Sequence, residues 1–358
     1  MPESILHKGR GATQNARSTR FDDSTRELDG DWRDASTLID GEAPPPRTTV
    51  TIEHPRTIVT RNTSPDVPFD RSINAYRGCE HGCVYCFARP THAFHNLSPG
   101  LDFETKLFAK PTAPALLRAE LMKRGYQPAT IAMGTNTDPY QPIEDTHRIT
   151  RALLEVLLEF EHPVSIVTKS DRVTRDLDLL APLAQRGLTH VGVSITTLDA
   201  VLARKLEPRA AIPKRRLAAV RQLTQAGVPT AVLIAPIIPA INDHEIEALV
   251  EAAAQAGALG VYAIPVRLPG EVAPLFRDWL ARHYPDRADH VMSLIRSIRD
   301  GRDNDPAFGS RMRGSGPYAD LIHARVAAAR RRFGVEGRLP PLTTDRFRVP
   351  GWQQLALL

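Results

Sequence analysis

The sequence predicts an α/β protein in which about six strand–helix repeats form a partial barrel. Short apolar, β-branched runs recur at 130–133, 164–168, 191–195, 231–234 and 261–264. Stretches with helical periodicity separate these runs, and near-continuous apolar strands are typical of a parallel sheet buried on both faces. A further strand at 73–77 completes about six repeats, which is short of the eight that close a full barrel. We therefore expect an open, TIM-like (β/α)6 barrel.

Helix boundaries support this alternation. Pro213 suits the first turn of a helix, and Gly227 suits the position just after its end. Strands that alternate with helices form right-handed βαβ units, whose strands are parallel.

Composition divides the chain into three parts. Residues 1–60 are rich in charge, Thr, Ser, Gly and Pro and lack a sustained period, so we expect an extended, partly disordered N-terminal arm. Residues 61–270 form the expected barrel. Residues 271–358 are expected to be mainly helical and are rich in arginine. The arginines fit two interpretations, solvated helix faces that cover the barrel or a docking surface for an acidic partner.

Charge and hydropathy exclude some classes. Lys and Arg number 46 and Asp and Glu 41, and a net charge of +5 does not by itself indicate a nucleic-acid-binding protein. No run of about 18 apolar residues predicts a transmembrane helix, and the N-terminus has no apolar stretch typical of a signal peptide. We expect a cytoplasmic protein that does not bind membranes.

The three cysteines lie within eight residues. Cys79, Cys83 and Cys86 follow a predicted strand with the spacing C-x3-C-x2-C. An odd number packed so closely is a poor disulfide framework, and in a reducing compartment it indicates a metal or cluster site. Three thiolates on one loop suit three irons of a [4Fe–4S] cluster, which leaves the fourth iron open to a small ligand. Gly78 and Gly82 allow the loop to turn.

Two other interpretations of the cysteines remain. A structural zinc ion could be bound by the three thiolates together with His81. Alternatively the cysteines are unligated, although their proximity has no packing rationale.

Several motifs together resemble a known superfamily. The pattern C-x3-C-x-aromatic-C, with Tyr85 at the aromatic position, resembles the radical S-adenosylmethionine (SAM) superfamily, in the branch related to spore photoproduct lyase. The superfamily resemblance covers roughly residues 70 to 270. An uncharacterised bacterial family is similar in the segments 8–12, 77–83, 136–142 and 206–209. The resemblance implies that a [4Fe–4S] cluster and SAM generate a 5′-deoxyadenosyl radical that abstracts hydrogen from a substrate.

The resemblance also implies site residues. It assigns Lys169 and Ser194 to the carboxylate and ribose region of SAM and Phe87 to the vicinity of adenine. From their positions after predicted strands, Asn136 and Asp138 suit the amino group of SAM, and Ala235 suits the adenine pocket. Each has an ordinary structural alternative, such as a solvated loop lysine, or a turn built by Asn and Asp. Glu207, close to Arg209, fits an ordinary ion pair.

Three functions compete. The first is a radical SAM enzyme with an unidentified substrate, reduced by an acidic flavodoxin or ferredoxin. The second is a DNA photoproduct lyase, but that family relies on an additional cysteine to return a hydrogen atom, and all three cysteines here belong to the loop. The third is a non-catalytic nucleic-acid-binding protein with a structural metal, although the sequence shows no interleaved aromatic residues for stacking on bases.

Overall fold

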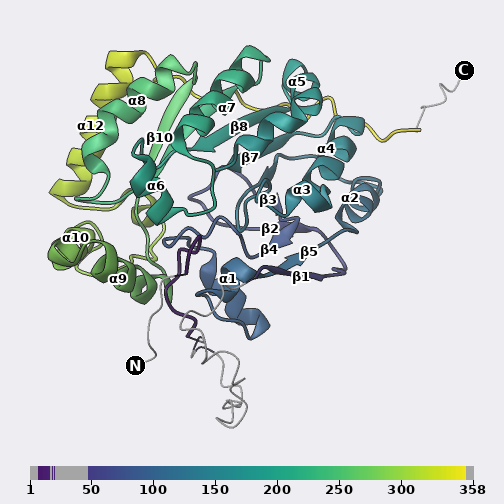
Figure 1. Cartoon of the computed structure of the whole chain (residues 1–358). Coiled ribbons are helices and arrows are strands. Elements are labelled where there is room, and N and C mark those ends of the chain that lie inside the picture. Colours follow the sequence, from purple (N-terminus) through teal and green to yellow (C-terminus); the bar gives the residue numbers. More distant parts are fainter. Residues whose placement is uncertain (1–6, 17, 19, 21–46, 352–358) are drawn as a thin grey trace, which may run out of the picture.

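A seven-stranded sheet forms the centre of the computed structural model, which describes residues 7–16, 18, 20 and 47–351. Figure 1 shows the sheet with helices packed along it. In chain order its strands are β2 (Val59–Arg61), β3 (Arg71–Ile73), β6 (Ile131–Met133), β7 (Val164–Thr168), β8 (Thr189–Ser194), β9 (Thr230–Ile237) and β10 (Gly260–Pro265). The spatial order is β10-β9-β8-β7-β6-β3-β2. Six strands of this sheet are parallel to one another, namely β3, β6, β7, β8, β9 and β10, and β2 is antiparallel to β3. The expected partial barrel of six repeats is confirmed.

The first predicted strand is placed differently. The strand that enters the sheet ends at Ile73, whereas Tyr76–Arg77 forms β4 in a second, three-stranded sheet with the order β1-β5-β4. That sheet also contains β1 (Thr49–Ile52) and β5 (Lys106–Ala109). The chain changes sheets because the carbonyl of Ala75 accepts a hydrogen bond from the Lys110 amide, at the end of β5.

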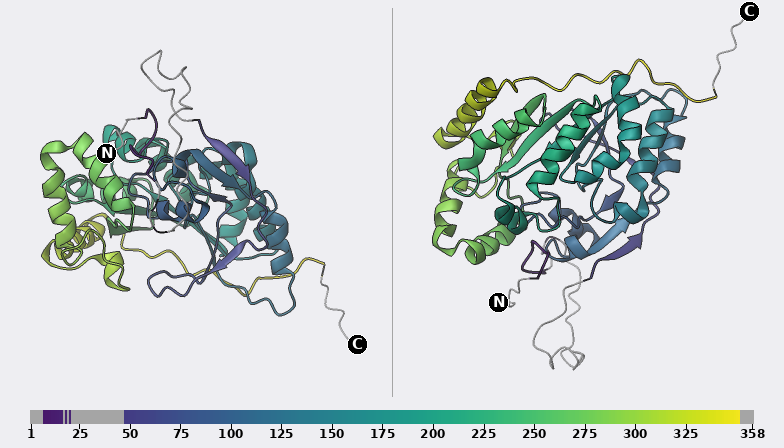
Figure 2. Two further views of the ribbon diagram at one scale, coloured as in Figure 1. Left: turned by 90° about the horizontal axis from the view of Figure 1, so that it is seen from below. Right: turned by 45° about the horizontal axis from the view of Figure 1, so that its top comes forward.

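Helices cover the sheet. Those of the repeats are α2 (Ala113–Leu121), α3 (Glu144–His147), α4 (Ile149–Glu159), α5 (Leu177–Gln185), α6 (Ala200–Leu206), α7 (Pro213–Gln225) and α8 (Ile246–Gln255). The C-terminal helices are α9 (Val272–His283), α10 (Ala288–Ser297), α11 (Ser310–Arg313) and α12 (Pro317–Phe333). The described residues also form the 3-10 helices η3 (Arg89–His95), η4 (Asp171–Asp176), η5 (Asp243–Glu245) and η6 (Pro285–Arg287), and the short α1 spans Asp102–Thr105. Figure 2 shows α12 along the outside of α8, at the β10 edge.

Two apolar cores hold these layers together. The larger core joins the strands to the inner faces of their helices, and in α4 it buries Ile149, Leu153 and Leu157. The second core joins α6, α9 and α10 to residues 83–85 of the cysteine loop. Because Phe276 and Trp279 of α9 are fully buried there, the C-terminal segment forms part of the wall around that loop.

The outermost strands of the sheet are the three-residue β2 at one edge and β10 at the other. The antiparallel strand β2 covers β3, and Gly260 of β10 forms a bridge with Glu336. Within the part of the chain that the structure describes, no helix combines the length and hydrophobicity that crossing a membrane requires.

Candidate active site at the cysteine loop

The cysteine loop, residues 78–88, connects β4 to η3. Its turns depend on Gly78 and Gly82, whose φ angles are +71° and +68°. A side chain at Gly82 would approach the Glu104 carboxylate to 2.8 Å, so glycine is needed there for space as well as for conformation. The Cys79 amide donates a hydrogen bond to the Phe103 carbonyl at 2.9 Å, and the Val84 amide donates to the Leu206 carbonyl at 3.1 Å. The loop is therefore fixed near its start and at its middle.

All three cysteines are free thiols. Cys79 and Cys83 are buried, and Cys86 is partly buried. Burial raises the pKa of each thiol, because a low-dielectric surrounding disfavours the thiolate. A positively charged centre is needed to hold them as thiolates, which is what a bound metal centre provides.

A buried ion pair supports the outer face of the loop, which is the face turned toward α1 and the N-terminal arm. Arg89 and Glu104 are both completely buried and pair with each other. Arg89 also donates to the carbonyls of Cys83, at 2.9 Å, and Gly82, at 3.2 Å. The backbone around Cys83 is thus held from behind.

The N-terminal arm lies on this same face. The amides of Gly11 and Ala12 donate to the Glu104 carboxylate at 2.9 and 2.8 Å. A side chain at Gly11 would come within 1.8 Å of the Gly82 carbonyl oxygen. The segment 8–12 is therefore packed onto the cysteine loop, and only glycine fits at this contact.

The segment 136–142 holds the inner face of the loop, which is the face turned toward the strand ends. Thr137 donates to the Gly78 carbonyl at 2.7 Å, and Gln141 accepts from the Glu80 amide at 2.9 Å. Asp138 lies 3.3 Å from Nδ1 of His81.

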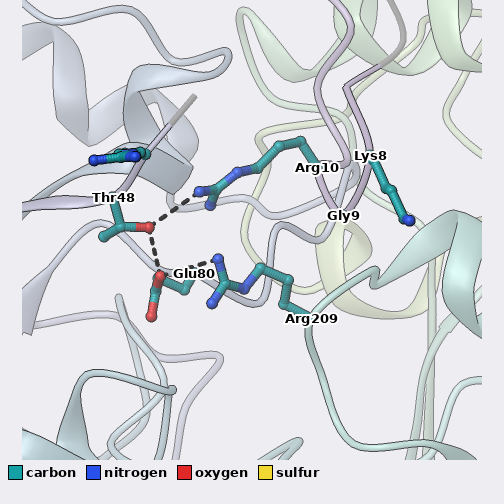
Figure 3. Close-up of a pocket in the computed structure, with 7 residues that line it drawn as sticks. Lys8, Gly9, Arg10, Thr48, Glu80 and Arg209 are labelled. Carbon is teal, nitrogen blue, oxygen red and sulfur yellow. Dashed lines mark hydrogen bonds and ion pairs between the residues drawn. The ribbon is translucent and has the colours of Figure 1, made fainter. Parts of the chain in front are cut away.

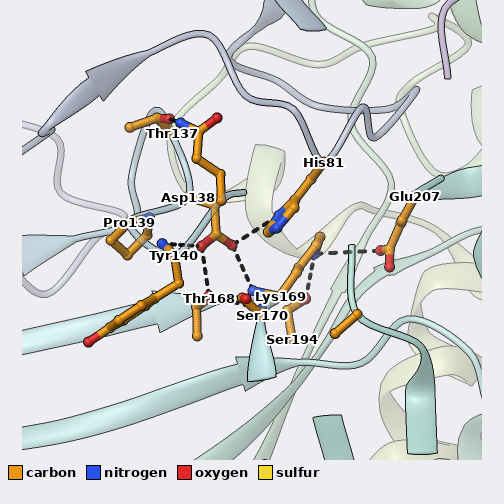
Figure 4. A network of polar contacts seen from close by, with 12 residues as sticks. His81, Thr137, Asp138, Pro139, Tyr140, Thr168, Lys169, Ser170, Ser194 and Glu207 are labelled. Carbon is orange, nitrogen blue, oxygen red and sulfur yellow. Dashed lines mark hydrogen bonds and ion pairs between the residues drawn. The ribbon is translucent and has the colours of Figure 1, made fainter. Parts of the chain in front are cut away.

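The same carboxylate reaches the end of β7. Asp138 accepts hydrogen bonds from the Thr168 hydroxyl and the Lys169 amide, both at 2.7 Å (Figure 4). Burial acts to raise the pKa of Asp138, but His81 and these hydrogen bonds outweigh it and lower the pKa to about 2. Asp138 thus links the cysteine loop to the sheet as a carboxylate.

A cluster of polar groups lies where β7, β8 and β9 end. Nζ of Lys169 donates to the Ser194 hydroxyl at 2.6 Å and to the Ala235 carbonyl at 3.3 Å. Its distance to the Glu207 carboxylate is 3.7 Å. Carboxyl ends of parallel strands share one edge, and the structure indeed brings Lys169, Ser194 and Ala235 together there.

Glu207 is the buried centre of this cluster. It pairs with Arg216 of α7, which is also buried, and accepts hydrogen bonds from Tyr85 and Thr196. Burial acts to raise the pKa of Glu207, but Arg216 and Lys169 lower it to about 2. The expected neighbour Arg209 instead pairs with Glu80 at 3.2 Å.

Two expected residues lie outside this cluster. Phe87 is 51% exposed. Asn136 has an exposed side chain, and its amide donates to Asn74 at 3.0 Å.

The donor set fits a cluster better than a single zinc ion. Among residues 7–16, 18, 20 and 47–351, no three His, Cys, Asp or Glu side chains converge closely enough to hold one metal ion. Three cysteines that each bind a different iron are further apart than ligands of one ion. His81 faces Asp138 through Nδ1, and its buried Nε2 has no hydrogen-bond partner.

Comparisons with known proteins show the family of the chain. The family model of the radical SAM superfamily matches residues 73–253. An uncharacterised protein of Mycobacterium tuberculosis is 35% identical over 288 residues, which cover 79% of this chain and 81% of that protein. A radical SAM Nα-GlyT isomerase of Pseudomonas phage M6 is 23% identical over 167 residues, covering 47% of this chain and 33% of that protein.

A solved structure of spore photoproduct lyase, in complex with a dinucleoside spore photoproduct, has the same fold. The TM-score is 0.54 at 16% identity, and the match covers 79% of each chain.

Fold and site therefore define a radical enzyme of the partial-barrel type. The chain belongs to the radical SAM superfamily. Its cofactors are a [4Fe–4S] cluster and SAM, and it needs a reductant and a substrate.

Several important residues escaped the sequence analysis. Arg89, Glu104 and Arg216 belong to no motif that marks them as functional in the sequence. The one available signal was that Glu104 and Arg89 flank a segment with few charges, which does not indicate that they pair.

Proposed function

We propose that Cys79, Cys83 and Cys86 bind three irons of the cluster and that SAM binds between them and the ends of β7 to β9. The observation that supports this most is the position of Tyr85. This residue belongs to the cysteine loop, its hydroxyl donates to Glu207, and Nζ of Lys169 lies 5.7 Å from the centre of its ring. Tyr85 thus connects the cysteine loop to the strand ends where Lys169 lies.

Charge balance makes Lys169 the partner of the SAM carboxylate. The negative charge of Glu207 is matched by Arg216, so the charge of Lys169 remains available to an anion. An ammonium group has three donors, and two of them are used by Ser194 and Ala235. The third is left for a carboxylate oxygen, in a charge-assisted hydrogen bond.

Asp138 acts in this proposal as a positioning residue. Its oxygens are engaged by Thr168, by the amides of Tyr140 and Lys169, and by His81. It fixes the start of the segment that carries Lys169. The amino group of SAM is left to Asn136, and Phe87 and Ala235 are proposed to contact adenine.

When bound, the reduced cluster and SAM supply a 5′-deoxyadenosyl radical that abstracts a hydrogen atom from the substrate. The protein contributes position and the exclusion of water. The apolar residues of α9 and α10 that pack on Tyr85 and Val84 serve the second purpose.

Anaerobic reconstitution tests the proposal. We expect about four irons per chain, because a [4Fe–4S] cluster contains that number, and a change in the EPR spectrum on adding SAM. Cys83→Ala should abolish reductive SAM cleavage and leave the circular dichroism spectrum largely unchanged. Persistent cleavage, or stoichiometric zinc with no iron uptake, would show that the cysteines have been assigned wrongly.

A DNA lesion is the second candidate substrate. The fold shared with spore photoproduct lyase favours it. The chain has three cysteines in total, all in the loop, so a different residue would have to return the hydrogen atom. Deuterium transfer into 5′-deoxyadenosine from labelled candidate substrates, including a thymine-dimer oligonucleotide, shows whether the substrate is a DNA lesion or another molecule.

We also propose a flavodoxin or ferredoxin as the electron donor and the cytoplasm as the compartment, because free thiols of this kind persist in a reducing environment. Several C-terminal arginines already have intramolecular partners. Arg325 pairs with Glu247, Arg296 with Asp303 and Arg330 with the Glu336 carbonyl. Stopped-flow measurement of the rate at which flavodoxin or ferredoxin reduces the cluster tests the choice of electron donor.

A further inference from the structure

A basic hollow lies on the outer face of the cysteine loop. It forms where the N-terminal arm, the segment before β1 and the segment after α6 meet, and its volume is about 490 Å³. Four cations line it together with one carboxylate, namely Lys8, Arg10, Arg47, Arg209 and Glu80. Figure 3 shows Arg10 and Arg209 reaching toward Thr48 and Glu80 from separate parts of the chain.

The single carboxylate does not balance these cations. Glu80 pairs with Arg209 at 3.2 Å and accepts a hydrogen bond from Thr48 at 2.5 Å. By contrast, the partly buried Arg151 pairs with two carboxylates, Asp176 and Asp178. Among the described residues that line the hollow, positive charge is therefore in excess.

Arg10 is the most buried of the four cations, with 9% of its surface exposed. Its guanidinium donates to the Glu104 carbonyl at 2.8 Å and to the Thr48 hydroxyl at 3.0 Å. Burial and the neighbouring charge of Arg209 lower the pKa of Arg10. A desolvated guanidinium that such hydrogen bonds hold in place can bind an anion with little reorganisation.

A tight turn presents the arm to the hollow. The Arg10 amide donates to the His7 carbonyl at 3.0 Å, and Gly9 has a φ angle of +75°. No atom lies within 4 Å of the position that a Gly9 side chain would occupy. Lys8 and Arg47 are exposed, and neither has a side-chain partner among the described residues.

The chemistry of this lining selects a phosphoryl group. Three guanidinium groups offer forked pairs of donors, a geometry that matches phosphate oxygens. A carboxylate would leave most of the positive charge uncompensated. We propose that this hollow binds a phosphoryl group beside the cysteine loop, carried by a nucleic-acid strand or by a phosphorylated small molecule.

Such a ligand would connect two elements of the active site. Glu80 follows Cys79 directly, and the Arg209 amide donates to the His81 carbonyl at 3.2 Å. Lys8 and Arg10 belong to the arm that packs on Gly82. A bound phosphate bridges the arm and the loop and orders both. The site goes beyond the radical reaction, since its occupancy does not depend on SAM cleavage.

Calorimetric titration of the reconstituted full-length protein tests the site. The probes are inorganic phosphate, thymidine 5′-monophosphate, a single-stranded oligothymidylate and acetate, at constant ionic strength. The variant Lys8→Gln/Arg47→Gln removes two exposed cations, and Lys214→Gln/Arg338→Gln removes two exposed cations elsewhere as a matched control. We expect the first variant to bind phosphate about tenfold more weakly or worse, as loss of charge-assisted hydrogen bonds predicts, and the control to bind like the unmodified protein.

The arms of the experiment identify the source of the phosphoryl group. Tighter binding of the oligonucleotide, with a salt dependence whose slope falls by about two in the first variant, supports a nucleic-acid strand. Tighter binding of the monophosphate supports a small molecule.

Three results would overturn the proposal. These are binding of acetate as tight as that of phosphate, equal losses in the two variants, or no phosphate binding together with slower reduction by flavodoxin in the first variant. The last result would assign the hollow to an acidic protein. SAM cleavage is measured separately, so a failure of this site is distinct from a failure of the proposed radical chemistry.

Discussion

The two faces of the cysteine loop are built differently. On the outer face, Arg89 and Glu104 are fully buried, and their bonds go to each other and to backbone groups. On the inner face, Lys169 is partly exposed, and its ammonium group contacts Ser194 and Ala235 at the strand ends. The comparison teaches that the outer face fixes the shape of the loop, whereas the inner face presents chemical groups. Substitutions on the outer face should therefore mainly lower stability, whereas substitutions on the inner face should mainly lower affinity for SAM.

The largest effect is expected for Glu104→Gln. Removing one partner of a buried ion pair leaves Arg89 buried without a counter-charge, which typically costs about 3–5 kcal/mol of unfolding free energy. Denaturant titration measures this loss. The control is Glu159→Gln, whose ion pair with Arg118 is exposed and should contribute less than about 1 kcal/mol. Equal effects of the two variants would contradict the assigned role of the outer face.

The second-largest effect is expected on acidification, which should lower the free energy of unfolding through His92. His92 is buried, and burial lowers its pKa to about 4. The unfolded chain has a pKa of about 6.5 and binds the proton more readily, so this contribution is fully present above pH 6.5 and is lost as the pH falls toward 4. The maximal loss is about 3 kcal/mol. Comparing the pH dependence of unfolding in His92→Asn and in the unmodified protein measures it, and parallel curves would exclude the contribution.

The smallest change in stability is expected on the inner face. Lys169→Met removes a partly exposed cation, so unfolding should change by no more than about 1 kcal/mol. Affinity for SAM should fall about ten- to hundredfold, because a charge-assisted hydrogen bond is lost. Equilibrium binding of SAM to the reconstituted protein measures this, with Lys214→Met as the control. A large loss of stability with unchanged affinity would place Lys169 in the scaffold instead.

The sequence analysis succeeded where local patterns determine structure. The apolar runs predicted the parallel strands, because each strand must be buried on both faces. The positions of Lys169, Ser194 and Ala235 after their strands predicted that they would meet, since parallel strands end at one edge. The first strand was placed too late: the strand of the central sheet ends at Ile73, and Tyr76, which is buried to the same extent, pairs in the other sheet.

The remaining features depend on contacts between distant residues. Nothing near Glu207 indicates that its partner is Arg216 rather than Arg209, since the choice follows from how α7 packs on β8. The position of the N-terminal arm also depends on a long-range contact, because Gly11 packs against Gly82, which lies 71 positions further along the sequence. From the sequence alone, charged residues are expected to be exposed, and only the packed structure shows which of them are buried.

The capped borders of the central sheet affect how the protein behaves at high concentration. An open parallel sheet ends in strands whose free amides and carbonyls can recruit strands of another molecule and so start aggregation. Here one outermost strand, β2, is only three residues long, and the other, β10, is met at Gly260 by the chain just after its last helix. Edges that are short or partly covered are poor templates for intermolecular pairing, so the barrel can stay unclosed with less risk of aggregation.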